Sequence, residues 1–562
     1  MFRNSIIKLL AKETALPEPE INRILEVPPE QKLGDFAFPC FILASKLKKS
    51  PVIIAQELSK KLKLPSDISS VNAVGPYLNF FVNKNAQASS ILSDIRKKKS
   101  KYGAQNNNAN IVVEYCGPNT NKPLHLGHLR NMSLGNSMCR ILEFSGNKVH
   151  PVNIINDRGI HICQSMLAYM KWGNNQKPTK KGDHFVGDFY VLYAQKAKVD
   201  ENLEKQAQEL LVKFEQKDPE VRALLKKMNS WVLKGFAETY KRFGISFEKE
   251  YFESIHYEKG KDVVYDGIKN KIFIKNDKGA IVAPLKKYEL SDKVVLRADG
   301  TSVYITQDMY LAQQRFSDFN FDKMIYVVAS EQELHFKQLF AILKMLNQPF
   351  ANKLHHLSYG LVNLPTGRMK SREGTVVDAD DIIDEIVSLA KSEVDKRYEK
   401  LSEKEKSKRA EFIGLAALKF FLLKTDASRD MIFNPEESIQ FEGETGPYIQ
   451  YTHARACSIL RKAKIKSSVS YNLLREPIEQ RMVTIISDFP SIIQQSAAQY
   501  KPHMICHYLL DLAQSFNEFY HAHQVISDNK DLMNARLHLV DGVRQVLTNG
   551  LELLGITAPE EM

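Results

Sequence analysis

The sequence predicts a doubly wound parallel α/β sheet, with a small α+β domain before it and an all-α bundle after it. In the middle of the chain, short apolar runs alternate with amphipathic helical patterns, which is typical of a parallel sheet. Toward the C-terminus, nearly every window has the helical period. The chain has 562 residues, and domains of about 150 residues each would divide it into three or four parts.

The first part is predicted to be a compact α+β domain. Two stretches with helical periodicity accompany apolar runs at residues 36–41 and 77–82. Three consecutive asparagines follow within residues 105–110, and such a run favours neither helix nor strand. We therefore place the first domain at residues 1–105.

The second part begins with a strand, a helix and another strand. Residues 111–116 are a short apolar run, residues 124–145 have the pattern of an amphipathic helix, and residues 148–156 resemble the first run. Pro123 at the start of the helix and Gly146 just past its end are typical of helix termini. This order predicts a βαβ unit of a parallel sheet.

The alternation then stops and resumes. Polar helices and Lys-rich turns fill residues 164–291, which we interpret as a helical insertion. One Rossmann-type domain would then span residues 106–385, followed by a helical domain at 386–562. Further strands are predicted at 302–306, 324–329 and 356–362, with helices beginning near Asp308 and Glu331.

Composition excludes several classes of protein. Hydrophobic residues make up 43% and charged residues 26%, so wholesale disorder is not expected. We find neither a membrane-spanning apolar run nor a secretory signal, and we therefore expect a soluble cytoplasmic protein with no membrane partner. The six cysteines never form a C-x-x-C pair, which argues against a zinc knuckle or a disulfide framework.

The basic excess is informative but ambiguous. The net charge is +12 and the isoelectric point is near 9.0. Such a balance suggests an anionic partner, with nucleic acid ahead of a membrane surface. The alternative, that the charge only keeps a large protein soluble, is about equally compatible with the number.

A candidate phosphate-binding corner follows the first strand of the sheet. It contains neither G-x-x-x-x-G-K-[ST] nor G-x-G-x-x-G but the segment PNTNKPLHLGHLR. His125 and His128 share one face of the first helical turn, where the helix dipole attracts anions. Gly127 would let a flat ring approach the backbone, and Lys122 adds a positive charge. The alternatives are two histidines that only cap the helix, or a zinc site with H-x-x-H spacing.

The segment EYCGPNTNKPLHLGHLRN resembles the HIGH signature region of class I aminoacyl-tRNA synthetases, in the form typical of the arginyl-tRNA synthetases. GRMKSREG at residues 367–374 resembles the second signature, the KMSKS loop, although Arg372 and Glu373 replace its final Lys-Ser. In the family, a lysine in the place of Lys122 is thought to supply the missing charge. The resemblance implies that the catalytic residues are His125, His128, Lys122, Lys370 and Arg372. It implies that ATP is bound by His125, Gly127, His128, Met369, Lys370 and Ser371.

A pocket for arginine requires carboxylates that can bind a planar guanidinium. The resemblance places Glu114, Tyr304 and Asp308 around that group. It places Asn119 and Gln332 at the α-ammonium and carboxylate groups. Taken singly, these residues have ordinary structural interpretations, such as Asp308 being a helix N-cap.

Both flanks extend the resemblance to nearly the whole chain. GDFAFP and AVGPYLNFF resemble the N-terminal domain of arginyl-tRNA synthetases, which contacts the tRNA elbow. There Tyr77 and Asn79 are candidate tRNA contacts, or else inward-facing strand residues. GETGPYIQYTHAR resembles the start of the helical anticodon-binding domain. Its candidate contacts are Tyr448, Tyr451 and Arg455, whose spacing suits base stacking or packing.

The activity that this resemblance implies is ligation of L-arginine to tRNA(Arg). Arginine and ATP would give arginyl-adenylate and pyrophosphate, and the terminal adenosine of the tRNA would then accept the arginine. We expect Mg²⁺ to be bound mainly through ATP, no metal site of the protein's own, and a monomer. The alternatives are a class I synthetase for another amino acid, a small HxGH nucleotidyltransferase, and an inactive tRNA-binding paralogue. The two acidic pocket residues, the helical last third and the intact signature histidines argue against these in turn.

Overall fold

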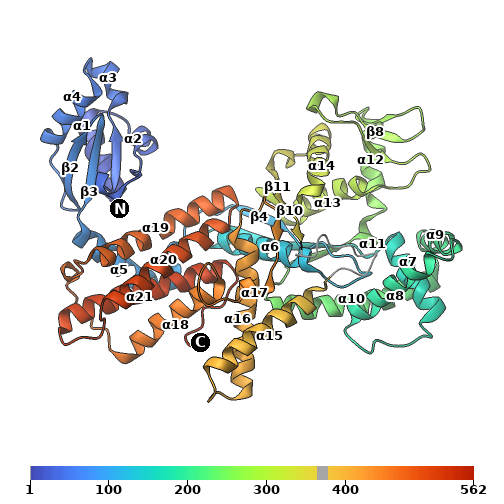
Figure 1. The fold of residues 1–562 in the computed structure, drawn as a ribbon. Helices are drawn as coiled ribbons and strands as arrows, with labels where there is room; N and C mark the ends of the chain where they lie inside the picture. The colour runs from blue at the N-terminus through green and yellow to red at the C-terminus, as the bar shows by residue number, and fades with distance from the viewer. Residues whose placement is uncertain (1, 364–376) are drawn as a thin grey trace. The chain divides into compact units, whose positions relative to one another are not determined.

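The structure is a computed structural model that describes residues 2–363 and 377–562 (Figure 1). The chain divides into two compact units. The first consists of Met1–Tyr102, Arg455–Asp488 and Gln514–Val546, and the second of Gly103–Ala454, Phe489–Ala513 and Leu547–Met562. Among the described residues, no helix is both long and apolar enough to cross a bilayer.

The start of the first unit is an α+β domain, as the sequence predicts. Its antiparallel sheet has the order β1-β3-β2, and Phe38 and Phe80 are fully buried in its core. The strands are β1 (Phe36–Pro39), β2 (Ile68–Val74) and β3 (Tyr77–Val82). The helices are α1 (Phe2–Thr14), α2 (Glu18–Ile24), α3 (Phe41–Leu47), α4 (Pro51–Lys61) and α5 (Lys84–Lys98).

The second unit contains a parallel sheet of five strands in the order β11-β10-β4-β5-β6 (Figure 1). The chain leaves the central strand β4 in one direction to β5 and β6, and later adds β10 and β11 on the other side. The predicted doubly wound topology is therefore confirmed. The strand order reverses between β4 and β10, and ligands of such folds bind at the carboxyl edge of this switch point. The strands are β4 (Asn110–Glu114), β5 (Lys148–Ile155), β6 (Lys249–Phe252), β10 (Lys323–Ala329) and β11 (Leu354–Tyr359).

Helix α6 (Leu126–Phe144) connects β4 to β5 and lies within two residues of its predicted limits. Nearly all of its side chains are buried. Gly135 faces the ring of Tyr115, and a Cβ at this glycine would overlap that ring. The close approach fixes α6 against the end of β4, so the start of the helix is held at the edge of the sheet.

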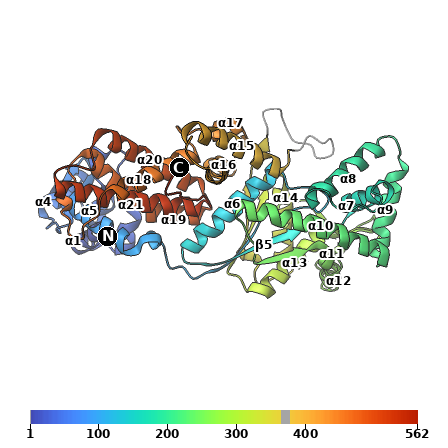
Figure 2. The same ribbon diagram turned by 90° about the horizontal axis from the view of Figure 1, so that it is seen from below.

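The insertion is less purely helical than the sequence suggests. Helices α7, α8 and α9 lie side by side (Figure 2). However, β6 joins the main sheet, and three short strands form a separate antiparallel sheet. The helices are α7 (Ile160–Trp172), α8 (Gly182–Ala197), α9 (Asn202–Glu215), α10 (Pro219–Phe243), α11 (Glu253–His256) and α12 (Lys259–Lys269). The small sheet consists of β7 (Ile274–Lys275), β8 (Ile281–Ala283) and β9 (Lys293–Leu296).

The prediction of a strand at residues 302–306 is wrong. Helix α13 (Tyr304–Phe319) already begins there. The hydroxyl of Thr306 accepts a hydrogen bond from the Val303 amide at 3.0 Å and donates one to the Val295 carbonyl at 2.6 Å. This hydrogen bond satisfies the free Val303 amide at the helix start. It therefore stabilises a helix in residues that by their type could also form a strand.

From residue 377 onward, the described elements are helices apart from β13 (Met431–Ile432), which pairs in parallel with β12 (Val362–Asn363). The loop predicted at residues 367–374 lies outside the described residues. Helix α14 (Glu333–Met345) precedes β11. The later helices are α15 (Ala379–Arg397), α16 (Glu403–Lys424), α17 (Pro435–Ser438), α18 (Gly446–Lys462), α19 (Pro477–Gln499), α20 (His503–Ala522) and α21 (Lys530–Leu553).

Candidate active site

His125 and His128 form the N-cap of α6. The Nδ1 atom of His125 accepts a hydrogen bond from the Gly127 amide at 3.2 Å, and the Nδ1 atom of His128 accepts one from the His125 amide at 3.1 Å. A neutral imidazole that accepts at Nδ1 carries its proton on Nε2. Each ring therefore presents an N–H donor at Nε2.

Both histidines are neutral at physiological pH. Burial and the nearby charge of Lys122 lower the pKa of His125 to about 3. Burial, His125 and Lys122 lower the pKa of His128 well below its ordinary value. A histidine binds a metal through an unprotonated ring nitrogen, and here both Nδ1 lone pairs already accept backbone hydrogen bonds. The zinc interpretation is therefore disfavoured, and the pair suits an oxygen-rich anion such as a phosphate.

Gly127 keeps the first ring in place. A Cβ at this position would lie 3.0 Å from Cε1 and 3.1 Å from Nδ1 of His125. Such a contact is tighter than ordinary van der Waals packing, so any side chain here would displace the ring. The glycine also leaves the backbone of this turn open to a flat ligand.

Glu114, at the end of β4, is buried and pairs with the guanidinium of Arg315 from α13. Arg315 lies over the rings of Tyr251 and Tyr326, 5.1 and 5.7 Å from their centroids. Burial raises the pKa of Glu114, and the charge of Asp308 acts in the same direction while Arg315 opposes it. The two predicted pocket acids thus lie within electrostatic reach of each other, and Glu114 already has a resident guanidinium as its partner.

The other three predicted pocket residues are exposed. Tyr304 is the first residue of α13, and 75% of it is accessible. Asn119 is exposed and forms an isolated parallel bridge with Asn156. Gln332 is exposed in the short 3₁₀ turn that precedes α14. All three side chains are available to a ligand.

The candidate tRNA contacts near the N-terminus differ in exposure. Tyr77 is half-buried, and its ring meets that of Phe41 edge to face, 5.9 Å between centroids. Phe41 itself is 55% exposed. Asn79 is buried in the central strand β3. Of the two predicted contacts, Tyr77 is therefore the more accessible.

The candidate contacts on α18 are partly exposed. Tyr448, Tyr451 and Arg455 lie at helical spacing. Arg455 donates to the Asn517 side chain at 2.5 Å, and its guanidinium lies 4.6 Å from the ring centroid of Tyr520. The predicted loop residues Met369, Lys370, Ser371 and Arg372 lie outside the described residues.

Comparison with known proteins identifies the family. Residues 89–435 match the model of the class I (R) tRNA synthetase catalytic domain. Residues 1–82 match the arginyl-tRNA synthetase N-terminal domain, and residues 449–562 match the DALR anticodon-binding domain. The chain belongs to the class I arginyl-tRNA synthetases.

Relatives of this synthetase match it over their full length. The arginine–tRNA ligase of Treponema denticola is 43% identical, over 98% of this chain and 97% of the relative. That of Bacteroides fragilis is 42% identical, over 94% of each chain. The solved arginyl-tRNA synthetase of Thermus thermophilus superposes with a TM-score of 0.86 at 28% identity, covering 100% of both chains.

Two residues of the synthetase that the sequence did not single out hold the site together. Arg130 of α6 is fully buried and donates to the backbone carbonyls of Ala427 and Arg429 at 2.9 and 2.7 Å. Asn131 accepts from the Cys116 amide at 2.5 Å and donates to the Val327 carbonyl at 2.8 Å. Their position two and three residues after the second histidine was the available signal.

The described part of the synthetase contains one group with metal-ligand spacing, Asp183, His184 and Asp380, whose ligand atoms lie within 4.8 Å of one another. The ammonium of Lys181 lies 2.8 Å from the Asp183 carboxylate and 2.6 Å from that of Asp380. A cation of the protein therefore already occupies the space between the two acids. The cluster is an ion-pair network rather than a metal site.

Proposed function

We propose that this protein is an arginine–tRNA ligase that supplies arginyl-tRNA for protein synthesis. It activates L-arginine with ATP to arginyl-adenylate and pyrophosphate, and then transfers the arginine to the terminal adenosine of tRNA(Arg). The observation that carries the proposal is the pair of neutral Nε2–H donors of His125 and His128 at the switch point of the sheet. The full-length likeness to arginine–tRNA ligases supports it.

The first step needs no protein nucleophile. The carboxylate of arginine attacks the α-phosphorus of ATP, and the bond to pyrophosphate breaks. His125 and His128 donate hydrogen bonds to phosphate oxygens, and Lys122 adds a positive charge. Lys370 and Arg372 act on the leaving pyrophosphate, and Met369, Ser371 and Gly127 complete the ATP site. Because the donors are fixed in advance, they need no reorganisation as charge develops.

Mg²⁺ accompanies ATP and neutralises part of the phosphate charge when it is bound. The one group of described residues with metal-ligand spacing already contains the ammonium of Lys181, which supports binding of the ion mainly through ATP. The protein's own contribution is to orient the phosphates with His125, His128 and Lys122.

Recognition of arginine depends on charge. Asp308 binds the guanidinium of the substrate, Tyr304 fixes its plane, and Glu114, which is paired with Arg315, belongs to the same pocket. Asn119 and Gln332 bind the α-ammonium and carboxylate groups. An uncharged amino acid would leave Asp308 with His335 as its only ion-pair partner among the described residues, and this disfavours other substrates.

The tRNA is bound by three modules. Residues 1–105 contact the elbow, residues 106–385 with their insertion at 164–291 hold the acceptor end, and residues 386–562 read the anticodon. The net charge of +12 suits this long anionic ligand. The contacts that we propose are Tyr77, Asn79, Tyr448, Tyr451 and Arg455.

The enzyme acts as a monomer in the cytoplasm, where tRNA is charged for translation. One chain contains the catalytic, N-terminal and anticodon-binding domains that the family models describe, so no second copy is needed to complete the ligand path. Sedimentation velocity with and without tRNA would test the monomer, which a stable dimer would contradict.

The decisive experiment is ATP–pyrophosphate exchange with each amino acid in turn, with and without total tRNA. We expect exchange and tRNA charging with arginine alone. A His125→Ala/His128→Ala double variant serves as the control and should lose exchange but retain tRNA binding. Charging of a different amino acid would overturn the proposal.

A further inference from the structure

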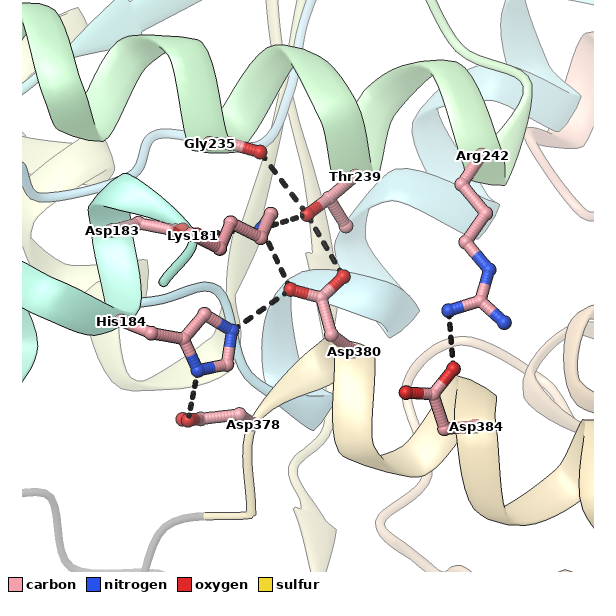
Figure 3. Close-up of polar contacts among 9 residues, drawn as sticks. All are labelled: Lys181, Asp183, His184, Gly235, Thr239, Arg242, Asp378, Asp380 and Asp384. Carbon is pink, nitrogen blue, oxygen red and sulfur yellow. Dashed lines mark hydrogen bonds and ion pairs between the residues drawn. The ribbon is translucent and has the colours of Figure 1, made fainter. Parts of the chain in front are cut away.

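Side chains from three separate helices meet beside the nucleotide corner (Figure 3). Lys181 and His184 come from the start of α8, Thr239 from α10, and Asp378 and Asp380 from the start of α15. These five residues, here called the α8–α15 latch, tie the insertion to the main domain. The mechanism proposed above uses none of them.

Asp380 is the centre of the latch. Its Oδ2 atom lies 2.6 Å from the Lys181 ammonium and 3.0 Å from Nε2 of His184, and its Oδ1 atom accepts from the Thr239 hydroxyl at 3.0 Å (Figure 3). Although burial acts in the opposite direction, hydrogen bonds from His184 and Lys181 hold the pKa of Asp380 well below its usual range. The carboxylate is therefore ionised and fully engaged.

The latch continues into the backbone that supports the catalytic histidines. Nδ1 of His184 lies 3.4 Å from the carboxylate of Asp378. The backbone of Asp378 forms an antiparallel bridge with that of His125, and the Ala379 amide donates to the Leu124 carbonyl at 2.8 Å. The start of α15 thus lies directly against the turn that presents the first signature histidine.

We propose that His184 and Asp380 are positioning residues for ATP: they hold the start of α15 against the turn at Leu124–His125. This inference rests on the proposed function, because it concerns the same nucleotide site. Loosening the latch shifts the support of His125 and weakens ATP binding. It leaves the arginine pocket unchanged, since Asp308 lies on α13.

The latch is sensitive to pH through His184. The hydrogen bond to Asp380 raises the pKa of His184, and it opposes the effect of burial. Below that pKa the ring is charged and attracts the ionised carboxylate of Asp380; above it, this attraction weakens, so we expect KM for ATP to rise with pH. Burial raises the pKa of Asp378 to about 6, so Asp378 is only partly ionised at pH 6. Helix α10 faces the latch with the hydroxyl of Thr239. The charged or titratable groups around it are Lys181 and Asp183 of the α8 start, Asp378, Asp380 and Asp381 of the α15 start, and Lys122 and His125 before α6.

The first test is Asp380→Asn, which keeps the shape of the side chain and removes its charge. We expect KM for ATP in arginine-dependent exchange to rise about tenfold, with kcat and KM for arginine changed less than about twofold. His184→Gln still donates a hydrogen bond but does not titrate. Its KM for ATP should lose the rise with pH that we expect of the wild-type protein.

Arg242→Gln is the matched control. Arg242 of α10 lies 2.6 Å from Asp384 of α15 and 2.8 Å from Glu411 of α16 (the Asp384 pair is shown in Figure 3). The variant therefore weakens the packing of α10 against α15 and α16 but removes no contact of the turn before α6. Its melting temperature should fall while KM for ATP stays unchanged.

An unchanged KM for ATP in Asp380→Asn, or an equal rise in Arg242→Gln, would show that the latch is only structural. If Asp380→Asn does not fold, Thr239→Val should raise KM for ATP instead, and His184→Gln should still abolish its pH dependence. Failure of both expectations overturns the inference. Wild-type protein that lacks arginine-dependent exchange would contradict the proposed function, whereas active wild type with unaffected variants contradicts only the latch.

Discussion

Nε2 of His335 lies 2.7 Å from the carboxylate of Asp308. His335 is on α14 and Asp308 on α13, so the contact joins two helices at the carboxyl edge of the sheet. It leaves the second carboxylate oxygen of Asp308 for a ligand. A histidine thus orients the acid that we place against the guanidinium of the substrate.

Asp308→Asn should lower kcat/KM for arginine about 100-fold, because a charge-assisted hydrogen bond of roughly 2–3 kcal/mol is lost. Arginine-dependent exchange measures the effect, and filter binding should show tRNA affinity unchanged. Asp318→Asn is the control, since Asp318 lies ten residues further along α13 and binds Lys249 at 2.7 Å. Equal losses in the two variants would remove Asp308 from the pocket.

Arg315→Met should destabilise the protein by about 3–5 kcal/mol, because it leaves the buried carboxylate of Glu114 without its cation. Adding Glu114→Gln should restore much of that loss, since the amide carries no charge. Urea unfolding of the wild-type, single and double variants measures both changes. A single variant as stable as the wild type would mean that Glu114 is protonated in the fold.

His125→Asn should separate capping from catalysis. Asparagine is as good an N-cap as the best residues, whereas alanine costs about 1 kcal/mol, so only His125→Ala should lose measurable stability. Both should lower kcat for exchange about 100-fold, because a fixed donor to the developing charge is lost.

The same histidine predicts a flat pH profile. Burial, with help from Lys122, lowers the pKa of His125 to about 3, so the ring stays neutral throughout pH 6–8. At saturating ATP, kcat of the wild type should show no step in this range. A step that disappears in His125→Asn would contradict the neutral-donor model.

Because Lys419 is buried, we expect the free energy of unfolding to rise with pH. It is buried in α16, donates to the Gly555 carbonyl at 2.7 Å and lies 4.8 Å from the ring centroid of Phe243. Burial lowers the pKa of Lys419 to about 7, below its value in the unfolded chain. Between pH 7 and about 10 the unfolded state binds more protons, so this group adds at most about 1.4 kcal/mol of stability per pH unit.

Urea unfolding at pH 7 and pH 9 measures this dependence. The wild type should gain stability over that interval relative to Lys419→Met. Lys408→Met is the control, because Lys408 is exposed on the same helix. A wild type whose stability relative to Lys419→Met stays constant over this interval would mean that the lysine remains charged in the fold.

The sequence was sufficient where a local pattern decides the structure. The helix at 124–145 follows from its apolar period and its two terminal residues, and α6 confirms it. The strand at 302–306 failed because a short run of this kind suits a strand or a helix start equally, and the hydroxyl of Thr306 decided between them. Strand β6 was missed because four residues among polar neighbours give no recognisable pattern.

The sequence pattern could not predict which side chains contact the site residues. Glu114 could be placed at the end of a strand, but the guanidinium that pairs with it belongs to Arg315, on a helix about 200 residues further along the chain. His184 and Asp380 are 196 residues apart in the chain, and nothing in either segment indicates the other. Motifs therefore indicated the candidate site residues, whereas packing determined which charges neutralise one another.

The capping of α6 by its own signature histidines has a consequence for how the catalyst is assembled. The backbone amides of His125 and Gly127 donate to the same two rings whose Nε2 atoms we propose as donors to the phosphates of ATP. The orientation of those rings is thus decided when the helix first forms, long before any nucleotide arrives. A folding intermediate with a properly started α6 would therefore already hold both rings in their orientation relative to the helix, before the start of α15 packs against this turn.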